Sequence, residues 1–330
     1  MKIIVVGGAG YIGSHAVKQL IENGDEVIVI DSLETGHRES VPQNIPFYQV
    51  DIRNKEALKA VFEKETVDGV IHFAANSLVG ESMTNPLKYY NNNVTGTETL
   101  LEVLIETGVK NIVFSSTAAT YGEVTEMPIL ESTPTSPTNT YGETKLAIEK
   151  MLKWTHKAHD LNYVCLRYFN VAGADASGTI GEAHTTETHL IPLILQVPLG
   201  QRPHITVFGT DYPTKDGTCI RDYIHITDLV NAHILALQYL MNGGESNIFN
   251  LGSNTGYSVL EMIEAARAVT GHPIPMEIGE RRAGDPALLI ASSEKAKKVL
   301  GWTPQYTDIK YIIASAWKWH QSHPNGYKGE

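Results

Sequence analysis

Short runs of β-branched and apolar residues alternate, through the first half of the chain, with longer segments in which apolar residues recur every three or four positions. The runs predict strands, and the segments predict helices because they are too long and too regular to be loops. This alternation is typical of a parallel sheet covered by helices, so we predict an α/β fold with a doubly wound, Rossmann-type sheet. The expected strands are residues 3–6, 27–30, 47–50, 67–73, 111–115 and 163–169, and the expected helices are residues 10–23, 55–65, 86–107 and 141–159.

This regular pattern ends after Asn170. Residues 171–190 are rich in glycine, alanine and threonine, and the segments beyond them no longer alternate cleanly. We therefore expect two domains, the sheet over residues 1–170 and a smaller mixed α/β domain over residues 171–330. Residues 221–240 have the pattern of a short strand followed by a helix that starts at an aspartate, which predicts a return to the first sheet around residues 220–240.

The charge and composition exclude some classes of partner. The 330 residues include 26 Lys and Arg against 37 Asp and Glu, a net charge of −11, which disfavours nonspecific attraction to nucleic acid or to an anionic membrane. No apolar run approaches the roughly 20 residues that a membrane span needs, and the N-terminal residues lack the pattern of a signal peptide. With only two cysteines, Cys165 and Cys219, the composition predicts a cytoplasmic protein.

Three glycines form a candidate phosphate-binding turn. Gly7, Gly10 and Gly13 lie between the first expected strand and the first expected helix, where glycine lets the backbone approach a pyrophosphate that the helix amides can bind. Asp31 ends the next strand, 24 residues after Gly7, in position to bind an adenosine ribose and to repel a 2′-phosphate, which favours NAD over NADP. The alternatives are a purely structural turn and a cation from residues 37–38 near the same ribose.

Asp51 and Ile52 end the third expected strand. Asp51 is expected either to reach the adenine of such a dinucleotide or to cap the next helix. The chain contains no GxxxxGK[ST] stretch, which argues against a phosphate-binding loop of the NTP-hydrolysing type.

Tyr141 and Lys145 are one helical turn apart, so their side chains share a face of an expected helix. The spacing alone decides little, because Tyr306 and Lys310 repeat it. The first pair, however, follows a strand that ends near Thr117, and ligands of doubly wound sheets bind at the carboxyl ends of the strands. A tyrosine whose pKa is lowered by a lysine and by a cationic nicotinamide can take the proton of an alcohol as hydride leaves. A packed tyrosine beside a solvated lysine is the alternative.

Further sequence blocks occur in order along nearly the whole chain: GGAGYIGSH, VIHFAA, VGES (79–82), NNVTGT (92–97), YGETK, LRYFN (166–170), DGTCIRDYIH (216–225), FNLG (249–252) and RRAGD (281–285). With them the chain resembles the UDP-glucose (UDP-galactose) 4-epimerases of the extended short-chain dehydrogenase/reductase family. The resemblance implies an isomerase that oxidises C4 of UDP-glucose or UDP-galactose with tightly bound NAD, lets the 4-keto sugar rotate, and returns the hydride to the opposite face. It further implies NAD in residues 1–170, the UDP-sugar in residues 171–330, and a homodimer.

The resemblance also implies roles for individual residues. Tyr141 would be the base, Lys145 would bind the nicotinamide ribose and lower the tyrosine pKa, and Thr117 would assist at the sugar oxygen. The residues implied to contact NAD are Gly7, Gly10, Tyr11, Ile12, Gly13, Asp31, Asp51, Ile52, Phe73, Ala74, Ala75, Asn93, Ser115, Tyr141, Lys145 and Tyr168. Those implied to contact the UDP-sugar are Thr117, Tyr141, Asn170, His189, Leu190, Phe208, Arg221, Arg282, Asp285 and Leu289, with the arginines on phosphate and Asp285 on the uridine ribose.

Three positions depart from the family pattern. Ser77 stands where many relatives have a lysine near the cofactor, and His189 stands where many have an asparagine at the diphosphate, so both contacts stay open. Leu289 falls where a larger tyrosine is associated with the exclusion of N-acetylated sugars. We therefore expect that UDP-N-acetylglucosamine is also accepted.

Other functions compete with epimerisation. A nucleotide-sugar dehydratase of the same fold would need the Asp-Glu pair that its members carry where this chain has Ala118 and Ala119. A net oxidoreductase would use the same Tyr–Lys pair, and a regulator that only binds NAD or a nucleotide sugar would need no catalytic group. We expect no metal, because the chain has no HExxH motif and because Glu182, His184, Glu187 and His189 fall in an expected loop without clear ligand spacing.

Overall fold

A seven-stranded parallel sheet forms the centre of the computed structural model, which describes residues 1–281 and 286–327. The strands of this sheet are β1 (Lys2–Val6), β2 (Glu26–Asp31), β3 (Phe47–Gln49), β4 (Gly69–His72), β5 (Asn111–Ser115), β6 (Asn162–Arg167) and β11 (Asn247–Asn250). Their order is β11-β6-β5-β4-β1-β2-β3, in which the first six strands of the chain follow the order of dinucleotide-binding sheets. The predicted Rossmann-type α/β fold is confirmed.

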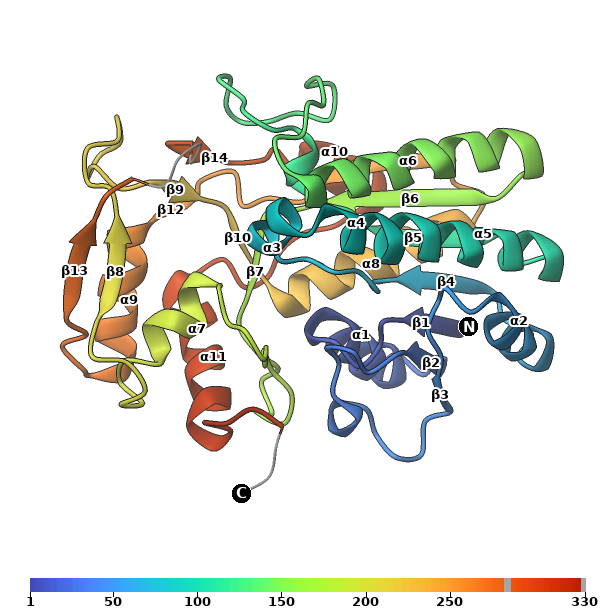
Figure 1. Ribbon diagram of the computed structural model, residues 1–330, viewed down its shortest axis with the longest axis horizontal. Helices are drawn as coiled ribbons and strands as arrows, with labels where there is room; N and C mark the ends of the chain where they lie inside the picture. The colour runs from blue at the N-terminus through green and yellow to red at the C-terminus, as the bar shows by residue number, and fades with distance from the viewer. Residues whose placement is uncertain (282–285, 328–330) are drawn as a thin grey trace.

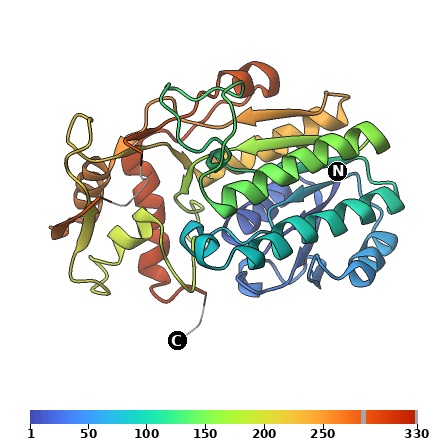
Figure 2. The same cartoon turned by 45° about the horizontal axis from the view of Figure 1, so that its top comes forward.

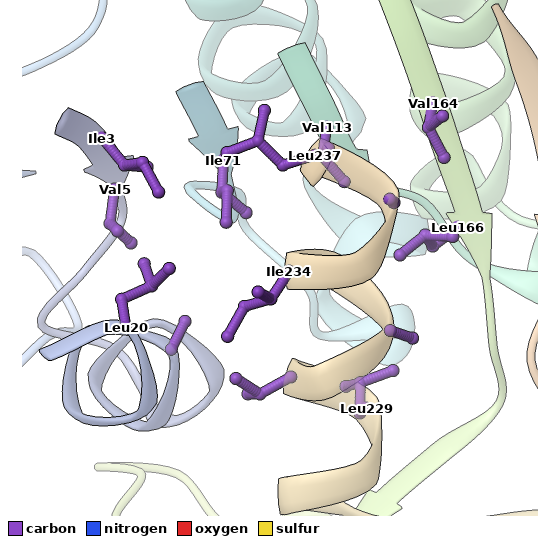
Figure 3. Close-up of a cluster of buried hydrophobic side chains, with 14 of the residues drawn as sticks. Ile3, Val5, Leu20, Ile71, Val113, Val164, Leu166, Leu229, Ile234 and Leu237 are labelled. Carbon is purple, nitrogen blue, oxygen red and sulfur yellow. The ribbon is translucent and has the colours of Figure 1, made fainter. Parts of the chain in front are cut away.

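Helices cover both faces of this sheet (Figure 1). On one face lie α2 (Lys55–Lys64), α5 (Gly96–Thr107) and α6 (Thr140–His159), and on the other lie α1 (Tyr11–Glu22) and α8 (Ile226–Met241). Figure 3 shows the second face, where Leu20 of α1 and Ile234 and Leu237 of α8 meet the aliphatic side chains Ile3, Val5, Ile71 and Val113 of the strands. Each such fully buried side chain contributes about 1.5–3 kcal/mol relative to an exposed one, which fixes the helices on the sheet.

The helix expected over residues 86–107 is interrupted. The structure has α4 (Pro86–Tyr89), a π-helical segment η2 (Tyr90–Thr95) and then α5. A π-helical turn inserts a residue into the helical repeat and is frequent at functional sites. Here it buries the side chain of Asn93 against the start of α6, which the apolar periodicity of the sequence does not reveal.

The chain leaves the sheet after β6 and builds a smaller region beside it (Figure 2). The core of this region lies between α7 (Leu190–Leu195), α9 (Val259–Thr270) and α11 (Ile309–Ser322). Because this core is separate from the two that cover the sheet, we propose a domain boundary near residue 170. The small sheets of the region are β7 (Asn170–Ala172) with β10 (Tyr223–His225), β12 (Tyr257–Ser258) with β9 (Ile220–Arg221) and β14 (Leu288–Leu289), and β8 (Ile205–Phe208) with β13 (Met276–Gly279).

The chain returns to the large sheet through α8 and β11, and α10 (Glu294–Leu300) packs against both of these elements. Two short elements pack against α6, namely α3 (Val79–Thr84) and η3 (Ala118–Thr120), and η1 (Arg38–Ser40) follows β2. None of the helices in the described part of the chain combines the length and the apolar character that a membrane span needs.

Candidate active site

The turn between β1 and α1 has room only for glycine at two positions. Gly7 has a φ of +81°, and a Cβ added to it would lie 2.5 Å from the backbone nitrogen of Ala74. A Cβ on Gly13 would lie 2.0 Å from the carbonyl oxygen of Gly7. These close approaches bring the N-terminus of α1 to the edge where β1 and β4 end, which is the place for a pyrophosphate in such folds.

Asp31 occupies the end of β2 beside this turn. Its carboxylate accepts hydrogen bonds from the backbone N–H groups of Ala9 at 2.9 Å and Leu33 at 2.8 Å. Burial raises the pKa of Asp31, and these two donors act against that rise. Arg38 does not approach the carboxylate, because its guanidinium donates to the carbonyl of Val41 at 2.7 Å and lies 4.6 Å from the centre of the Phe47 ring.

Asp51 and Ile52 lie after β3 with different surroundings. Asp51 is half-exposed and pairs with Arg53, which lowers the pKa of the carboxyl group. The residue that caps α2 is Asn54, whose side chain accepts a hydrogen bond from the backbone N–H of Ala57, so the alternative role of Asp51 as the cap is wrong. Ile52 is buried against Gly96 of α5.

The residues that follow β4 lie against the glycine turn. The backbone N–H groups of Phe73 and Ala74 both donate to the carbonyl of Val6, and the Phe73 ring lies 4.8 Å from that of His233 in α8. Ala75 continues this edge and leads to Asn76.

Asn93 is fully buried behind this edge. Its amide donates to the carbonyl of Asn76 at 3.0 Å and to the hydroxyl of Thr144 at 3.1 Å. The side-chain amide nitrogen of Asn76, Nδ2, is buried and has no hydrogen-bond partner among the described residues. It is therefore a donor that a ligand at this edge can satisfy. Sequence reasoning missed Asn76, whose only signal was its place after the VIHFAA block.

Tyr141 and Lys145 lie at the end of β5, as their position after the strand that ends near Thr117 predicted. Asn139 caps α6 by accepting a hydrogen bond from the backbone N–H of Gly142, which places Tyr141 in the first turn of the helix. The Lys145 ammonium is buried and donates to the carbonyl of Ser115 at 2.8 Å. The Tyr141 phenol lies beside Thr117, which acts to lower the pKa of the phenol.

The pKa shifts of Tyr141 and Lys145 do not follow the expectation that the lysine lowers the pKa of the tyrosine. Burial raises the pKa of Tyr141 to about 12, against which the hydrogen bond with Thr117 acts. Burial also lowers the pKa of Lys145 to about 7, while the carboxylate of Glu149 acts in the opposite direction. The Lys145 ammonium is bound to the Ser115 carbonyl, and it is not among the groups that act on the pKa of Tyr141.

A buried polar network lies behind the pair, and sequence reasoning missed it. Glu149 accepts hydrogen bonds from the hydroxyl of Ser116 and from Nε of Arg167 at 2.9 Å, and the guanidinium lies 4.7 Å from the centre of the Tyr121 ring. Ser115 and Tyr168 are joined through their hydroxyl groups. The one signal in the sequence was an acid four residues after Lys145 on the same helix.

The residues expected at the UDP-sugar fall into separate groups. Asn170, His189 and Leu190 line one small pocket together with Tyr223. Arg221 in β9 pairs in register with Leu289 in β14, and its guanidinium donates to the carbonyl of Ile220 at 2.8 Å.

Three other positions singled out in the sequence belong to neither group, and two lie outside the described residues. Phe208 ends β8, where its ring is 37% exposed. Ser77 lies in the loop between β4 and α3. Tyr11 is the first residue of α1, and its hydroxyl donates to the carbonyl of Gly173 at 2.6 Å. Arg282 and Asp285 lie outside the described residues.

The chain matches known proteins over its whole length. The model of the NAD dependent epimerase/dehydratase family matches residues 3–252. A UDP-glucose 4-epimerase of Halalkalibacterium halodurans is 59% identical over 330 residues, which are 100% of this chain and 98% of that protein. A crystal structure of a UDP-glucose 4-epimerase, 59% identical, has a TM-score of 0.98 and covers 100% of both chains.

A further solved structure contains ligands. It is a UDP-glucose 4-epimerase from Bifidobacterium longum in complex with NAD+ and UDP, 39% identical, with a TM-score of 0.93 over 99% of this chain and 100% of that one. The glycine turn, Asp31 and the Tyr141–Lys145 pair thus lie in a fold that this enzyme shares. This chain belongs to the NAD dependent epimerase/dehydratase family.

Proposed function

We propose that this protein is an NAD-dependent isomerase that interconverts UDP-glucose and UDP-galactose by inverting C4 of the sugar. The observation that carries this function is the placement of Tyr141 and Lys145 at the end of β5, beside Thr117 and a dinucleotide-binding turn, in a chain 59% identical to a UDP-glucose 4-epimerase over its full length. A hydroxyl pair at this edge suits proton transfer to and from an alcohol.

The residues at the sheet edge fit NAD. Gly7 and Gly13 leave space that a Cβ would fill, and Asp31 offers its carboxylate to a ribose. The side-chain amide nitrogen of Asn76 is a buried donor that needs an acceptor. We propose that NAD lies along the turn and that it contacts Ile52, Phe73 and Tyr168 on its way to Lys145. NAD supplies the hydride acceptor and a positive charge when it is bound.

In this proposal Tyr141 takes the proton of the sugar 4-hydroxyl and later returns it. Thr117 holds the reacting oxygen and the phenol in one hydrogen-bonded group. Lys145 is kept in place by the Ser115 carbonyl, from which it can reach a ribose hydroxyl. Burial excludes water from the phenol, so that a positive charge brought beside it has a larger effect on its pKa than it would have in water.

We propose that the nucleotide part of the substrate lies on the smaller region. Arg221 and Arg282 would bind the diphosphate, since guanidinium groups offer paired donors to phosphate oxygens. Asn170 and Leu190 would border it from the small pocket, and Asp285 would accept from the uridine ribose. An acidic protein can hold such an anion because local donors, and not its net charge, make the site.

Incubation of the purified protein with UDP-galactose and no added NAD tests the function. We expect UDP-glucose to form without a change in absorbance from NADH, because the cofactor is regenerated in each cycle. NADH produced in proportion to product would instead indicate a net oxidoreductase, and loss of water from the sugar would indicate a dehydratase. Binding of both ligands without turnover would indicate a regulator.

Leu289 is proposed to set the size of the sugar pocket. It packs against the cluster of Ala118, Tyr121 and Ile129, whose first member directly follows Thr117 in the chain. We expect the protein to turn over UDP-N-acetylglucosamine, and we expect Leu289→Tyr to lower kcat/KM for this sugar by at least about tenfold, with a change of less than about threefold for UDP-glucose. Both values come from product analysis with each sugar.

The neighbouring residue provides a matched control. Leu288 precedes Leu289 in β14, so its side chain points to the opposite face of the strand. Leu288→Tyr should leave the ratio of the two kcat/KM values unchanged. A wild-type protein inactive on UDP-N-acetylglucosamine would contradict the proposed role of Leu289.

We further propose a homodimer in the cytoplasm. The segments expected to form its interface, residues 86–107 and 141–159, carry the exposed side chains Leu87 and Trp154. Exposed large apolar side chains on such helices are typical of an interface between two copies.

A further inference from the structure

Four side chains of metal-ligand type converge in the segment between β7 and α7. They are Glu182, His184, Glu187 and His189, which we call the Glu–His cluster. One ligand atom from each lies within 4.8 Å of the others. Both carboxylates are largely buried, with 7% of the Glu182 side chain and 10% of the Glu187 side chain exposed. Their spacing in the sequence gave no sign of this convergence.

The two imidazoles turn the same atom toward both carboxylates. Nδ1 of His184 lies 3.4 Å from Glu182 and 3.2 Å from Glu187, and Nδ1 of His189 lies 3.0 Å from Glu182 and 2.9 Å from Glu187. A single Nδ1–H can point at only one of these two carboxylates at a time. Hydrogen bonds between the side chains therefore do not account for all four approaches, whereas one cation at their centre does.

Charge balance leads to the same conclusion. Within the described residues, the ion pairs of Glu182 and Glu187 involve only these two imidazoles. Glu187 also accepts hydrogen bonds from the backbone N–H groups of Thr188 at 2.8 Å and His189 at 2.7 Å, but two largely buried carboxylates still require about two positive charges nearby. One divalent cation supplies both while the imidazoles remain neutral ligands.

We propose that the Glu–His cluster binds one Zn²⁺ ion in a closed, four-coordinate site. Zinc is bound by imidazole nitrogen and carboxylate oxygen at about 2.0–2.2 Å, and a tetrahedron of that size sets neighbouring ligand atoms roughly 3.3–3.5 Å apart. The observed contacts of 2.9–3.4 Å are close to this spacing. The two imidazole donors disfavour Mg²⁺ and Ca²⁺, which select oxygen ligands.

Four protein ligands make the site structural, because a catalytic zinc keeps one position for water or substrate. The segment is also held on two sides, since the Trp319 indole of α11 donates to the carbonyl of Glu182 and a ring nitrogen of His37 lies 3.1 Å from the carbonyl of Ala183. His189 leads directly into α7 and borders the small pocket. The ion would therefore fix the path of this segment between the large sheet and the pocket, whatever the pocket binds.

Metal analysis of the full-length protein, purified without a histidine tag, tests the proposal. We expect about one zinc per chain after dialysis against metal-free buffer. Removal of the zinc by a chelator should lower the midpoint of thermal unfolding, and added Zn²⁺, but not Mg²⁺, should restore it. Cobalt(II) added to the stripped protein should give the visible absorption of a four-coordinate site. Stripped protein that takes up neither Zn²⁺ nor cobalt(II) would overturn the proposal.

Single substitutions locate the ion. Glu187→Gln and His184→Gln should each weaken zinc binding by more than about tenfold. His204→Gln is the matched control, and this variant should keep the zinc of the wild type. His204 precedes β8 and lies 3.1 Å from Glu277 of β13, in a more exposed Glu–His pair. Zinc retained equally by wild type, Glu187→Gln and His184→Gln would place the ion elsewhere and contradict the assignment. Should either variant fail to fold, the cobalt titration of the wild type decides.

Discussion

Replacement of Tyr141 by phenylalanine is expected to reduce kcat for the conversion of UDP-galactose by about 10²–10⁴-fold, the usual contribution of a positioned acid or base. The phenol lies beside Thr117 at the end of β5, where the proposal places the sugar 4-hydroxyl. Phenylalanine keeps the ring and its packing, so binding of UDP and of NAD should change by less than about threefold. The measurement is the initial rate of UDP-glucose formation, with UDP affinity from calorimetry.

Tyr306→Phe is the matched control. Tyr306 and Lys310 have the same spacing as Tyr141 and Lys145, but Tyr306 lies before the N-cap of α11 and stacks on Tyr311. This variant should keep wild-type turnover. A Tyr141→Phe protein that keeps more than about a tenth of the wild-type kcat would show that another group carries the proton.

The elements of the large sheet could be predicted because the hydrophobic pattern records burial. Residues 3–6 and 27–30 are apolar and β-branched, and residues 111–115 have an apolar centre, because both faces of their strands are covered; each range lies within or coincides with an observed strand. The π-helical η2 and the seventh strand β11 were not predicted. The π-helical turn accompanies the buried hydrogen bond of Asn93 to Asn76, a contact between distant segments. The position of the four-residue strand β11 is set by its pairing with β6, its neighbour in the sheet.

The site was predictable where one short segment determines the geometry. Gly7 and Gly13 are recognisable because the backbone itself excludes a Cβ, and Tyr141 and Lys145 because one helix, starting soon after a strand that ends near Thr117, carries both. The Glu–His cluster lies in a segment without regular structure, so no period relates its members. The pKa of Tyr141 depends on how deeply the phenol is buried, which no spacing in the sequence reports.

Arg167→Met is expected to lower the free energy of unfolding by roughly 3–5 kcal/mol, the cost of removing one partner from a buried ion pair. The side chains of Arg167 and Glu149 are only 4% and 3% exposed. Methionine fills most of the volume of the arginine stem, so the loss comes from the carboxylate left in the core, with the Ser116 hydroxyl as its remaining hydrogen-bond donor among the described residues. The measurement is the urea midpoint, with the slope checked for a common unfolding transition.

A second substitution separates charge from packing. Glu149→Gln combined with Arg167→Met removes the stranded charge, and the double variant should be more stable than Arg167→Met alone, because the cost of a buried ion lies mainly in leaving it unpaired. Lys297→Met is the surface control: its partner Glu294 is 72% exposed, and water already solvates that pair, so the midpoint should barely move. An Arg167→Met variant as stable as Lys297→Met would contradict this prediction and would mean that the Glu149 carboxylate pairs with another cation. Lys145, one turn away on α6, already interacts with this carboxylate electrostatically. That outcome would also appear as a change in the pH dependence of turnover, since Lys145 is part of the proposed catalytic group.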